Sequence, residues 1–173
     1  MKSFVVRLAV AAAALSFVTA VQAQDYPKRP VTMIVPFAAG GTSDVIARAV
    51  AEEMSKPLGQ PIIIENVAGA GGSTALTRAA RAEPDGYTIA IGNAGTSAAT
   101  YTIYPKLPFT PESFAPVAVV AKTFGIVALR KDFPARDFGE FVDYLKKNGD
   151  SVKQAHGGVG SSSHMACLLF TSE

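Results

Sequence analysis

Short apolar segments alternate with segments of helical spacing in the first half of the chain, and this alternation limits the fold more than any other feature. The apolar segments cover residues 31–36, 61–66 and 87–93, and the segments between them cover 42–58 and 69–82. Short apolar runs are typical of strands buried on both faces, and helices between such strands connect them in parallel. The order strand, helix, strand, helix, strand therefore predicts an α/β fold with a parallel sheet covered by helices.

The ends of the first helix can also be predicted. Asp44 lies in its first turn, where a carboxylate interacts favourably with the helix dipole. Pro57 has no backbone N–H, which predicts that the helix ends or is distorted near Lys56.

Beyond residue 93 the pattern is less regular. Residues 94–114 contain three prolines and are predicted to form a loop with one short helix. A helix over 137–149 is indicated by an apolar face and by Asn148-Gly149 as its C-cap. The other predicted elements are two strands across a turn at 116–123 and 125–130, a short strand at 152–158, and a helix that follows the glycine-serine turn at 160–163.

The first 23 residues have the features of an export signal. Lys2 and Arg7 precede an apolar stretch from Leu8 to Val18, and Val21-Gln22-Ala23 places small residues where a signal peptidase cuts. A membrane anchor is the alternative, but the stretch is too short to span a bilayer of about 30 Å as a helix. We expect the mature chain to begin at Gln24 and to be soluble in the periplasm.

Composition excludes several classes of function. Removal of the segment with Lys2 and Arg7 lowers the number of basic residues from 16 to 14, which equals the 14 acidic ones. The net charge of the mature chain is therefore near zero, and nothing favours binding to nucleic acid. The single cysteine, Cys167, has no partner for an internal disulfide, which remains compatible with an oxidising compartment.

Three turns rich in glycine and hydroxyl side chains follow strand-like runs, at residues 40–43, 92–97 and 158–163. Ligands of open α/β sheets bind outside the carboxyl ends of the strands, where such turns converge. The N–H groups at a helix N-terminus bind anions, and neutral donors without a fixed positive charge suit a carboxylate better than a triphosphate. Each turn taken alone is also explained as a simple connection between elements.

Other chemistry is less well supported by these turns. None carries the lysine of a phosphate-binding loop, and none has the complete glycine pattern of a dinucleotide site. Gly95-Thr96-Ser97 approaches a nucleophile elbow but lacks its final glycine, so a small exported hydrolase using Ser97 or Ser161 stays as the alternative from another class. His164 and Cys167 are three residues apart, but two ligands are weak evidence for a metal.

The order of these turns after a signal peptide resembles the Bug family, the periplasmic solute receptors of tripartite tricarboxylate transporters. The resemblance rests on "YPKRPVTMIVPFAAGGTSDVIARAVAEEM", "LGQPIIIENVAGAGGSTA", "AEPDGYTIAIGNAGTSA", "YPKLPFTPESFAPVAVVA" and "HGGVGSSSHMACLLF". Departures are Ala39 where the family often has proline, Val67-Ala68 where it often has Arg-Pro, and Pro57 inside the first helix.

The resemblance implies a periplasmic-binding-protein-like (type II) fold of two α/β lobes that close on a small di- or tricarboxylate without catalysis, cofactor or metal. The lobes would cover 24–111 and 112–173, and the expected partners are a carboxylate and the membrane subunits of the transporter. Family members are about twice as long, so we expect a truncated receptor, with a non-binding remnant as the alternative; a complete receptor would be a monomer. The implied ligand-binding residues are Phe37, Ala38, Gly40, Gly41, Thr42, Asp44, Asn93, Ala94, Gly95, Thr96, Gly160, Ser161, Ser163 and His164.

Overall fold

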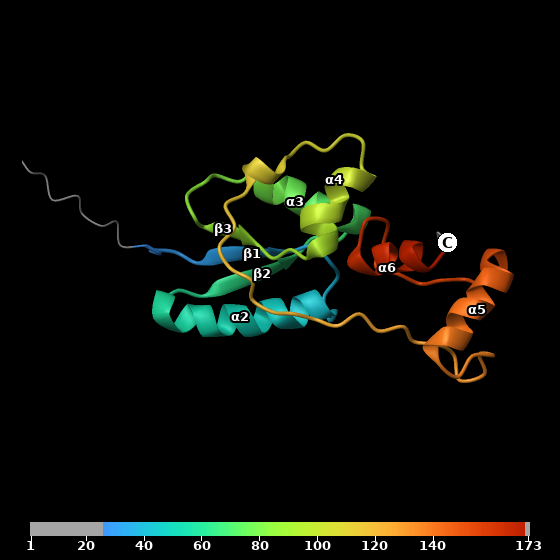
Figure 1. Cartoon of the computed structure of the whole chain (residues 1–173). Helices are drawn as coiled ribbons and strands as arrows, with labels where there is room; N and C mark the ends of the chain where they lie inside the picture. Colours follow the sequence, from blue (N-terminus) through green and yellow to red (C-terminus); the bar gives the residue numbers. More distant parts are fainter. Residues whose placement is uncertain (1–25, 172–173) are drawn as a thin grey trace, which may run out of the picture.

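A three-stranded parallel sheet forms the centre of the computed structural model, which describes residues 26–171 (Figure 1). The predicted export signal and the expected first mature residue lie outside the described residues. The strands are β1 (Val31–Val35), β2 (Ile62–Asn66) and β3 (Thr88–Ala90), in the order β2-β1-β3. Strand β1 lies in the middle, pairs with both neighbours and is almost completely buried, as its apolar sequence predicts.

Two helices cover opposite faces of this sheet, α2 (Thr42–Leu58) on one and α3 (Ser73–Ala80) on the other (Figure 1). The chain moves from β1 to β2 in one direction and from β2 past β1 to β3 in the other. Because both crossovers are right-handed in parallel sheets, this reversal puts the two connecting helices on opposite faces. The predicted α/β fold with a parallel sheet is thereby confirmed.

The core lies between the sheet and α2. Its buried members are Met33, Val35 and Ala47, and partly buried side chains pack around them, namely Val50, Met54, Ile62, Ile64, Ile89 and Ile91. Burying an aliphatic side chain stabilises the fold by about 1.5–3 kcal/mol. This cluster therefore fixes the position of α2 under the strands, and with it the loop that joins β1 to the helix.

Helix α2 ends two residues later than its proline predicts. Pro57 lies inside the last turn, and the helix stops at Gly59, whose left-handed backbone (φ 64°) lets its N–H donate to Ser55 O at 3.0 Å. A proline so close to the end removes only one helical hydrogen bond, and the glycine cap satisfies a neighbouring carbonyl.

The segment after β3 is more helical than expected. A π-helical turn over Gly95–Ala99 leads directly into α4 (Thr100–Ile103), and a 3₁₀ turn over Pro111–Ser113 follows. Phe109 is buried beneath this segment and makes edge contacts with the rings of Tyr101 and Phe114.

The strands predicted at 116–123, 125–130 and 152–158 are wrong for the part of the chain that the structure describes. Residues 115–130 run in an extended form without a ladder partner, and Val117, Phe124 and Ile126 are 93%, 94% and 87% exposed. A strand needs a neighbour that accepts and donates its backbone hydrogen bonds, and the described residues supply none here. An apolar sequence pattern alone therefore did not identify a strand of the sheet.

The last two helices match their predicted positions. Helix α5 (Phe138–Asn148) begins at Asp137, whose carboxylate accepts the Glu140 N–H at 2.9 Å, and it buries Phe141. Gly149 is the C-cap residue, as predicted, but it keeps a right-handed backbone and continues into a 3₁₀ turn (Gly149–Ser151) instead of adopting the usual left-handed cap conformation. Helix α6 (Ser162–Thr171) contacts both α5 and the turn at 95–99.

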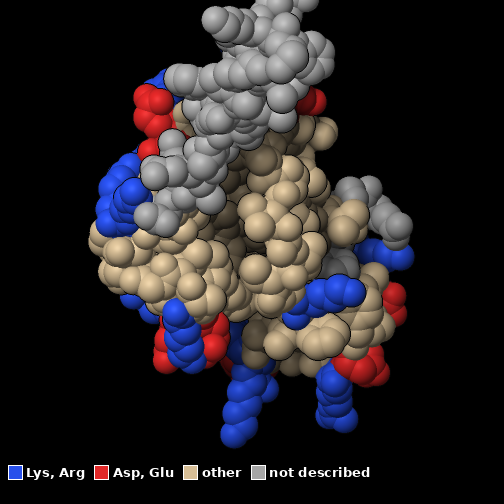
Figure 2. All heavy atoms as spheres, turned by 90° about the vertical axis from the view of Figure 1, so that its left-hand side faces the viewer, with Lys and Arg blue, Asp and Glu red and all other residues tan. Residues whose placement is uncertain are grey.

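Charged side chains of both signs lie around the rim of the face shown in Figure 2, and the middle of that face is uncharged. This distribution agrees with a chain whose acidic and basic residues nearly balance. Among the described residues, no helix has the length and apolar character that crossing a membrane requires.

Candidate functional site

A cavity of about 500 Å³ lies where three glycine-rich loops meet. One loop follows β1, one follows β2, and the third precedes α6. The lining residues are Phe37, Ala38, Ala39, Gly41, Ala68, Gly69, Ala70, Gly71, Gly72, Gly157 and Gly158. Two of the loops thus leave the carboxyl ends of neighbouring parallel strands, which is where α/β sheets bind ligands.

The chemistry of this cavity is that of the backbone. Phe37 is the single large side chain among the described lining residues, all others are glycine or alanine, and none carries a charge. Helix α2 begins at the cavity, and its N-cap, Gly41, has no side chain to accept the first N–H groups. Free N–H groups at a helix N-terminus attract anions. The arrangement is therefore suited to a small anion held by neutral donors.

The first predicted loop forms one wall of the cavity. Phe37, Ala38 and Gly41 line it, Thr42 is the exposed first residue of α2, and Gly40 is not among the lining residues. The Gly40 N–H points instead to the carboxylate of Asp44, at 2.8 Å.

A polar cluster of the buried Asp44, the half-exposed Arg48 and the partly buried Asn66, which we call the Asp44 cluster, lies beneath this loop. Arg48 donates from Nε to Asp44 Oδ2 at 3.0 Å and lies with Nη2 2.9 Å from Oδ1, and Asn66 Nδ2 donates to Oδ1 at 2.9 Å. The side chain of Asp44 is 4% exposed. Hydrogen bonds from Arg48, the Gly40 N–H and Asn66 hold the pKa of the Asp44 carboxyl well below its usual range. Asp44 is therefore ionised at neutral pH, with its oxygens bonded within the protein.

The second predicted loop, Asn93 to Thr96, bonds mainly to itself. Asn93 Oδ1 accepts the N–H groups of Gly95 and Thr96 at 2.9 and 3.1 Å, and the Thr96 hydroxyl accepts the Asn93 N–H at 2.9 Å. Thr96 is completely buried, and this loop, including Ala94, is not among the residues that line the cavity. Its role in ligand binding stays a prediction.

The third predicted group stands at the start of α6. Ser161 Oγ lies 3.1 Å from Ser163 Oγ and accepts the His164 N–H at 3.2 Å, while His164 Nδ1 accepts the Gly160 N–H at 3.2 Å. These side chains order their own turn, and the cavity is lined by the preceding Gly157 and Gly158. The hydroxyl of Ser161 bonds to a serine and to a backbone N–H, so this geometry forms no serine–imidazole pair.

Sequence reasoning missed the loop after β2, residues 68–72, as part of the site. A Cβ on Gly71 would overlap the carbonyl of Val159, so this glycine lets the turn before α6 approach backbone to backbone. Its φ of 61° also lies in the left-handed region that favours glycine. The available signal was the glycine-rich segment 69–72, which lies a few residues after β2, a strand that ends at the same edge of the sheet.

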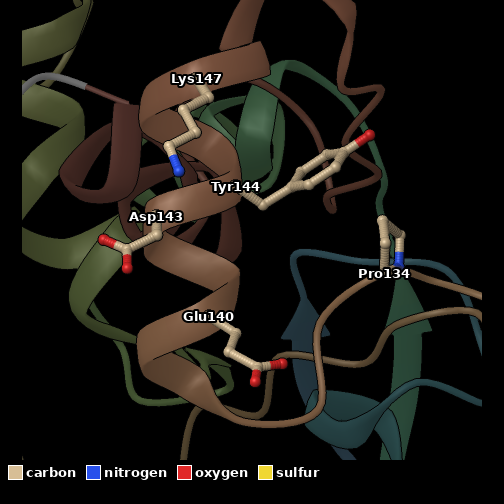
Figure 3. A pocket seen from close by; sticks show the side chains of 5 residues that line it. All are labelled: Pro134, Glu140, Asp143, Tyr144 and Lys147. Carbon is tan, nitrogen blue, oxygen red and sulfur yellow. The ribbon is translucent and has the colours of Figure 1, made fainter.

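A second, shallower hollow of about 280 Å³ lies on α5, away from the three loops. Figure 3 shows its lining side chains, which are Pro134, Glu140, Asp143, Tyr144 and Lys147. It carries both signs of charge, and Glu140 is already engaged by the Arg136 N–H at 2.7 Å. Among the described residues, no three His, Cys, Asp or Glu side chains come together to hold a metal ion.

Comparison with known proteins places this arrangement in a class. The chain is similar to a solved periplasmic binding protein, BugD, with 38% identity and a TM-score of 0.72 over 85% of this chain and 49% of that one. It is 44% identical to MatC of Rhodopseudomonas palustris with bound malate (TM-score 0.75) and 31% identical to another R. palustris protein with adipate (TM-score 0.79), in each case over 85% of this chain and 50% of the other. The fold is that of periplasmic solute-binding proteins, and these structural neighbours are solute-binding proteins and not enzymes.

The family follows from the sequence. Residues 46–173 match the tripartite tricarboxylate transporter family receptor, and the chain belongs to this family. It is 38% identical to a UPF0065 protein of Bordetella pertussis over 162 residues, and 42% identical to one of Agrobacterium vitis over 151 residues. These alignments cover 93% and 86% of this chain but 50% and 43% of the relatives, so the chain spans about half of their length.

Proposed function

We propose that the cavity binds a small carboxylate and that the chain serves as an exported receptor for a tripartite tricarboxylate transporter. The observation that carries this proposal is the neutral, backbone-lined wall at the N-terminus of α2. An oxyanion there accepts hydrogen bonds from main-chain N–H groups and interacts favourably with the helix dipole. Two solved relatives of the same fold contain malate and adipate, which are both dicarboxylates.

The proposal extends to the expected location and lobes. The apolar segment from Leu8 to Val18, with its small residues before Gln24, supports export, and the relatives that are periplasmic binding proteins support the periplasm. We assign 24–111 to a first lobe and 112–173 to part of a second lobe, with transporter membrane subunits as partners. The predicted residues of the second loop would then lie beside the first loop, and those of the third loop would face the ligand from the opposite side.

The test is titration calorimetry with mono-, di- and tricarboxylates, malate and adipate among them. Wild-type protein is expected to bind at least one acid, and Gly41→Val is expected to abolish binding. A Cβ at Gly41 would meet only Ala38 O at 3.7 Å, and the backbone φ of −80° accepts a side chain, so the variant should fold normally and differ only in the cavity.

The matched control is Gly125→Val, the same substitution in open space outside the cavity. It should bind like the wild type. Failure of the wild type to bind any acid of the panel would favour the non-binding alternative, and unchanged affinity of Gly41→Val would remove the first loop from the site.

A further inference from the structure

The Asp44 cluster is connected to both ends of the loop that forms the first wall of the cavity. At one end, Asn66 Nδ2 donates to the carbonyl of Phe37 at 3.0 Å, and at the other the Gly40 N–H donates to Asp44 Oδ2 at 2.8 Å. Arg48 connects Asp44 and Asn66, because its guanidinium donates to the Asp44 carboxylate and also to Asn66 Oδ1 at 3.3 Å. Asp44 of α2 and Asn66 at the end of β2 thus bond to two loop residues, Phe37 and Gly40, and Arg48 joins the two side chains.

These bonds determine how the loop presents its backbone. The N–H of Gly40 points inward to Asp44, and in a planar trans peptide the carbonyl of Ala39 points the opposite way. Gly40 has φ 86°, which a residue with a side chain rarely adopts. Without an inward acceptor, that N–H would need another partner, and the peptide between Ala39 and Gly40 would be free to rotate.

The charges show that the cluster is a support rather than a ligand contact. The Asp44 carboxylate accepts hydrogen bonds from three residues and is nearly completely buried, and neither Asp44, Arg48 nor Asn66 is among the residues that line the cavity. Buried charges of this kind are held by partners on every side, and charge-assisted hydrogen bonds are the strong ones.

We infer that Asp44, Arg48 and Asn66 are positioning residues that hold the Phe37–Gly41 loop in the shape that binds ligand, without touching the ligand themselves. This rests on the proposed function of the cavity. If the loop adopts the binding shape in only about 1–10% of molecules once the cluster is broken, the apparent affinity falls by roughly 10- to 100-fold. Asp44 therefore acts on the site through the backbone of Gly40.

The experiment compares Asp44→Asn with Glu53→Gln, a control that neutralises a carboxylate of the exposed Lys56–Glu53 pair on the same helix. Titration with malate and adipate should show a 10- to 100-fold weaker affinity for Asp44→Asn and wild-type affinity for Glu53→Gln. Asn66→Ala, which keeps the Asp44–Arg48 pair but releases the Phe37 carbonyl, should also bind more weakly. Equal affinity of all four proteins would overturn the inference.

A ligand-free measurement separates this inference from the function itself. In ¹H–¹⁵N spectra the Gly40 amide proton should move upfield in Asp44→Asn, because it loses a carboxylate acceptor, and should not move in Glu53→Gln. If the wild type binds neither acid but Gly40 shifts as expected, the carboxylate function fails and the loop support stands. An unshifted Gly40 resonance in a folded Asp44→Asn protein would refute the supporting role of Asp44, independently of any ligand.

Discussion

The contact between the turn before α6 and the π-helical turn Gly95–Ala99 is expected to fail when Gly95 gains a methyl group. A Cβ at Gly95 would lie 2.5 Å from Ser162 N, 2.7 Å from Gly160 O and 2.8 Å from Ser161 C. Ordinary contacts begin at 3.4 Å, so the turn must move by about one ångström. All three atoms belong to the backbone, and no change of rotamer relieves the overlap.

The size of the effect follows from a matched substitution. Gly95→Ala and Gly149→Ala replace glycines in helical turns without a positive φ, and a Cβ at Gly149 has no neighbour within 4 Å. Both variants gain up to about 1 kcal/mol of helix propensity, so the difference between them isolates the overlap. Overpacking costs about 1–3 kcal/mol. At 2–4 °C per kcal/mol for a chain of this size, Gly95→Ala should melt roughly 2–12 °C below Gly149→Ala.

Thermal unfolding followed by circular dichroism measures this difference, and hydrogen exchange locates it. Peptides that cover 157–164 should exchange faster in Gly95→Ala, because the buried Ser161 loses its neighbours, while peptides from β1 should not change. Equal melting temperatures for the two variants, together with unchanged exchange at 157–164, would refute the reasoning.

Three further outcomes are expected. The exported protein should fractionate with the periplasm with Gln24 as its first residue, and N-terminal sequencing that finds Met1 on a membrane-bound product contradicts this. Phe124→Lys should reduce aggregation of the purified protein, measured by light scattering, because the native side chain is 94% exposed; equal scattering counts against it. The pKa of Asp44 is lowered in the folded state, so its stabilising contribution is complete above the unfolded pKa near 4 and is lost as the pH falls further. The melting temperature of Asp44→Asn should therefore depend less on pH below 4 than that of the wild type. Melting temperatures of the two proteins that fall in parallel with pH would contradict the assignment.

The sequence was most informative where local pattern and tertiary environment agree. Strand β1 reads as apolar throughout because both of its faces are covered, and α2 reads as amphipathic because one face packs on the sheet. Glycine turns after strands pointed to the edge of the sheet where the cavity of the three loops lies. These signals depend on residues that are near one another in the chain or in one layer, which is why they predict the fold.

Prediction failed where the decisive partner is distant in sequence. Nothing local distinguishes Val117–Val120 from a paired strand, because pairing depends on a neighbour and not on the segment itself. The inward direction of Asp44 depends on Asn66, 22 residues away, and the closeness of Gly71 to Val159 depends on a turn that the chain reaches much later. The burial of Thr96 and Ser161, whose hydroxyl groups bond within their own turns, likewise depends on contacts that the local sequence does not show, and their predicted ligand contact stays a prediction.

The scarcity of side chains in the cavity bears on how ligand preference can change during evolution. A wall built from main-chain groups keeps its donors and acceptors under most substitutions, because each non-proline residue has one N–H and one C=O group; mutation alters it mainly by adding side-chain bulk, as in Gly41→Val. Among the described lining residues, Phe37 alone has a large side chain, so under the proposed function substitutions there change the size and polarity of the acid that fits while the backbone donors stay in place. Divergence in ligand preference is then expected at Phe37 and at residues outside the described cavity, while glycines of the wall such as Gly41 and Gly71 are expected to stay unchanged.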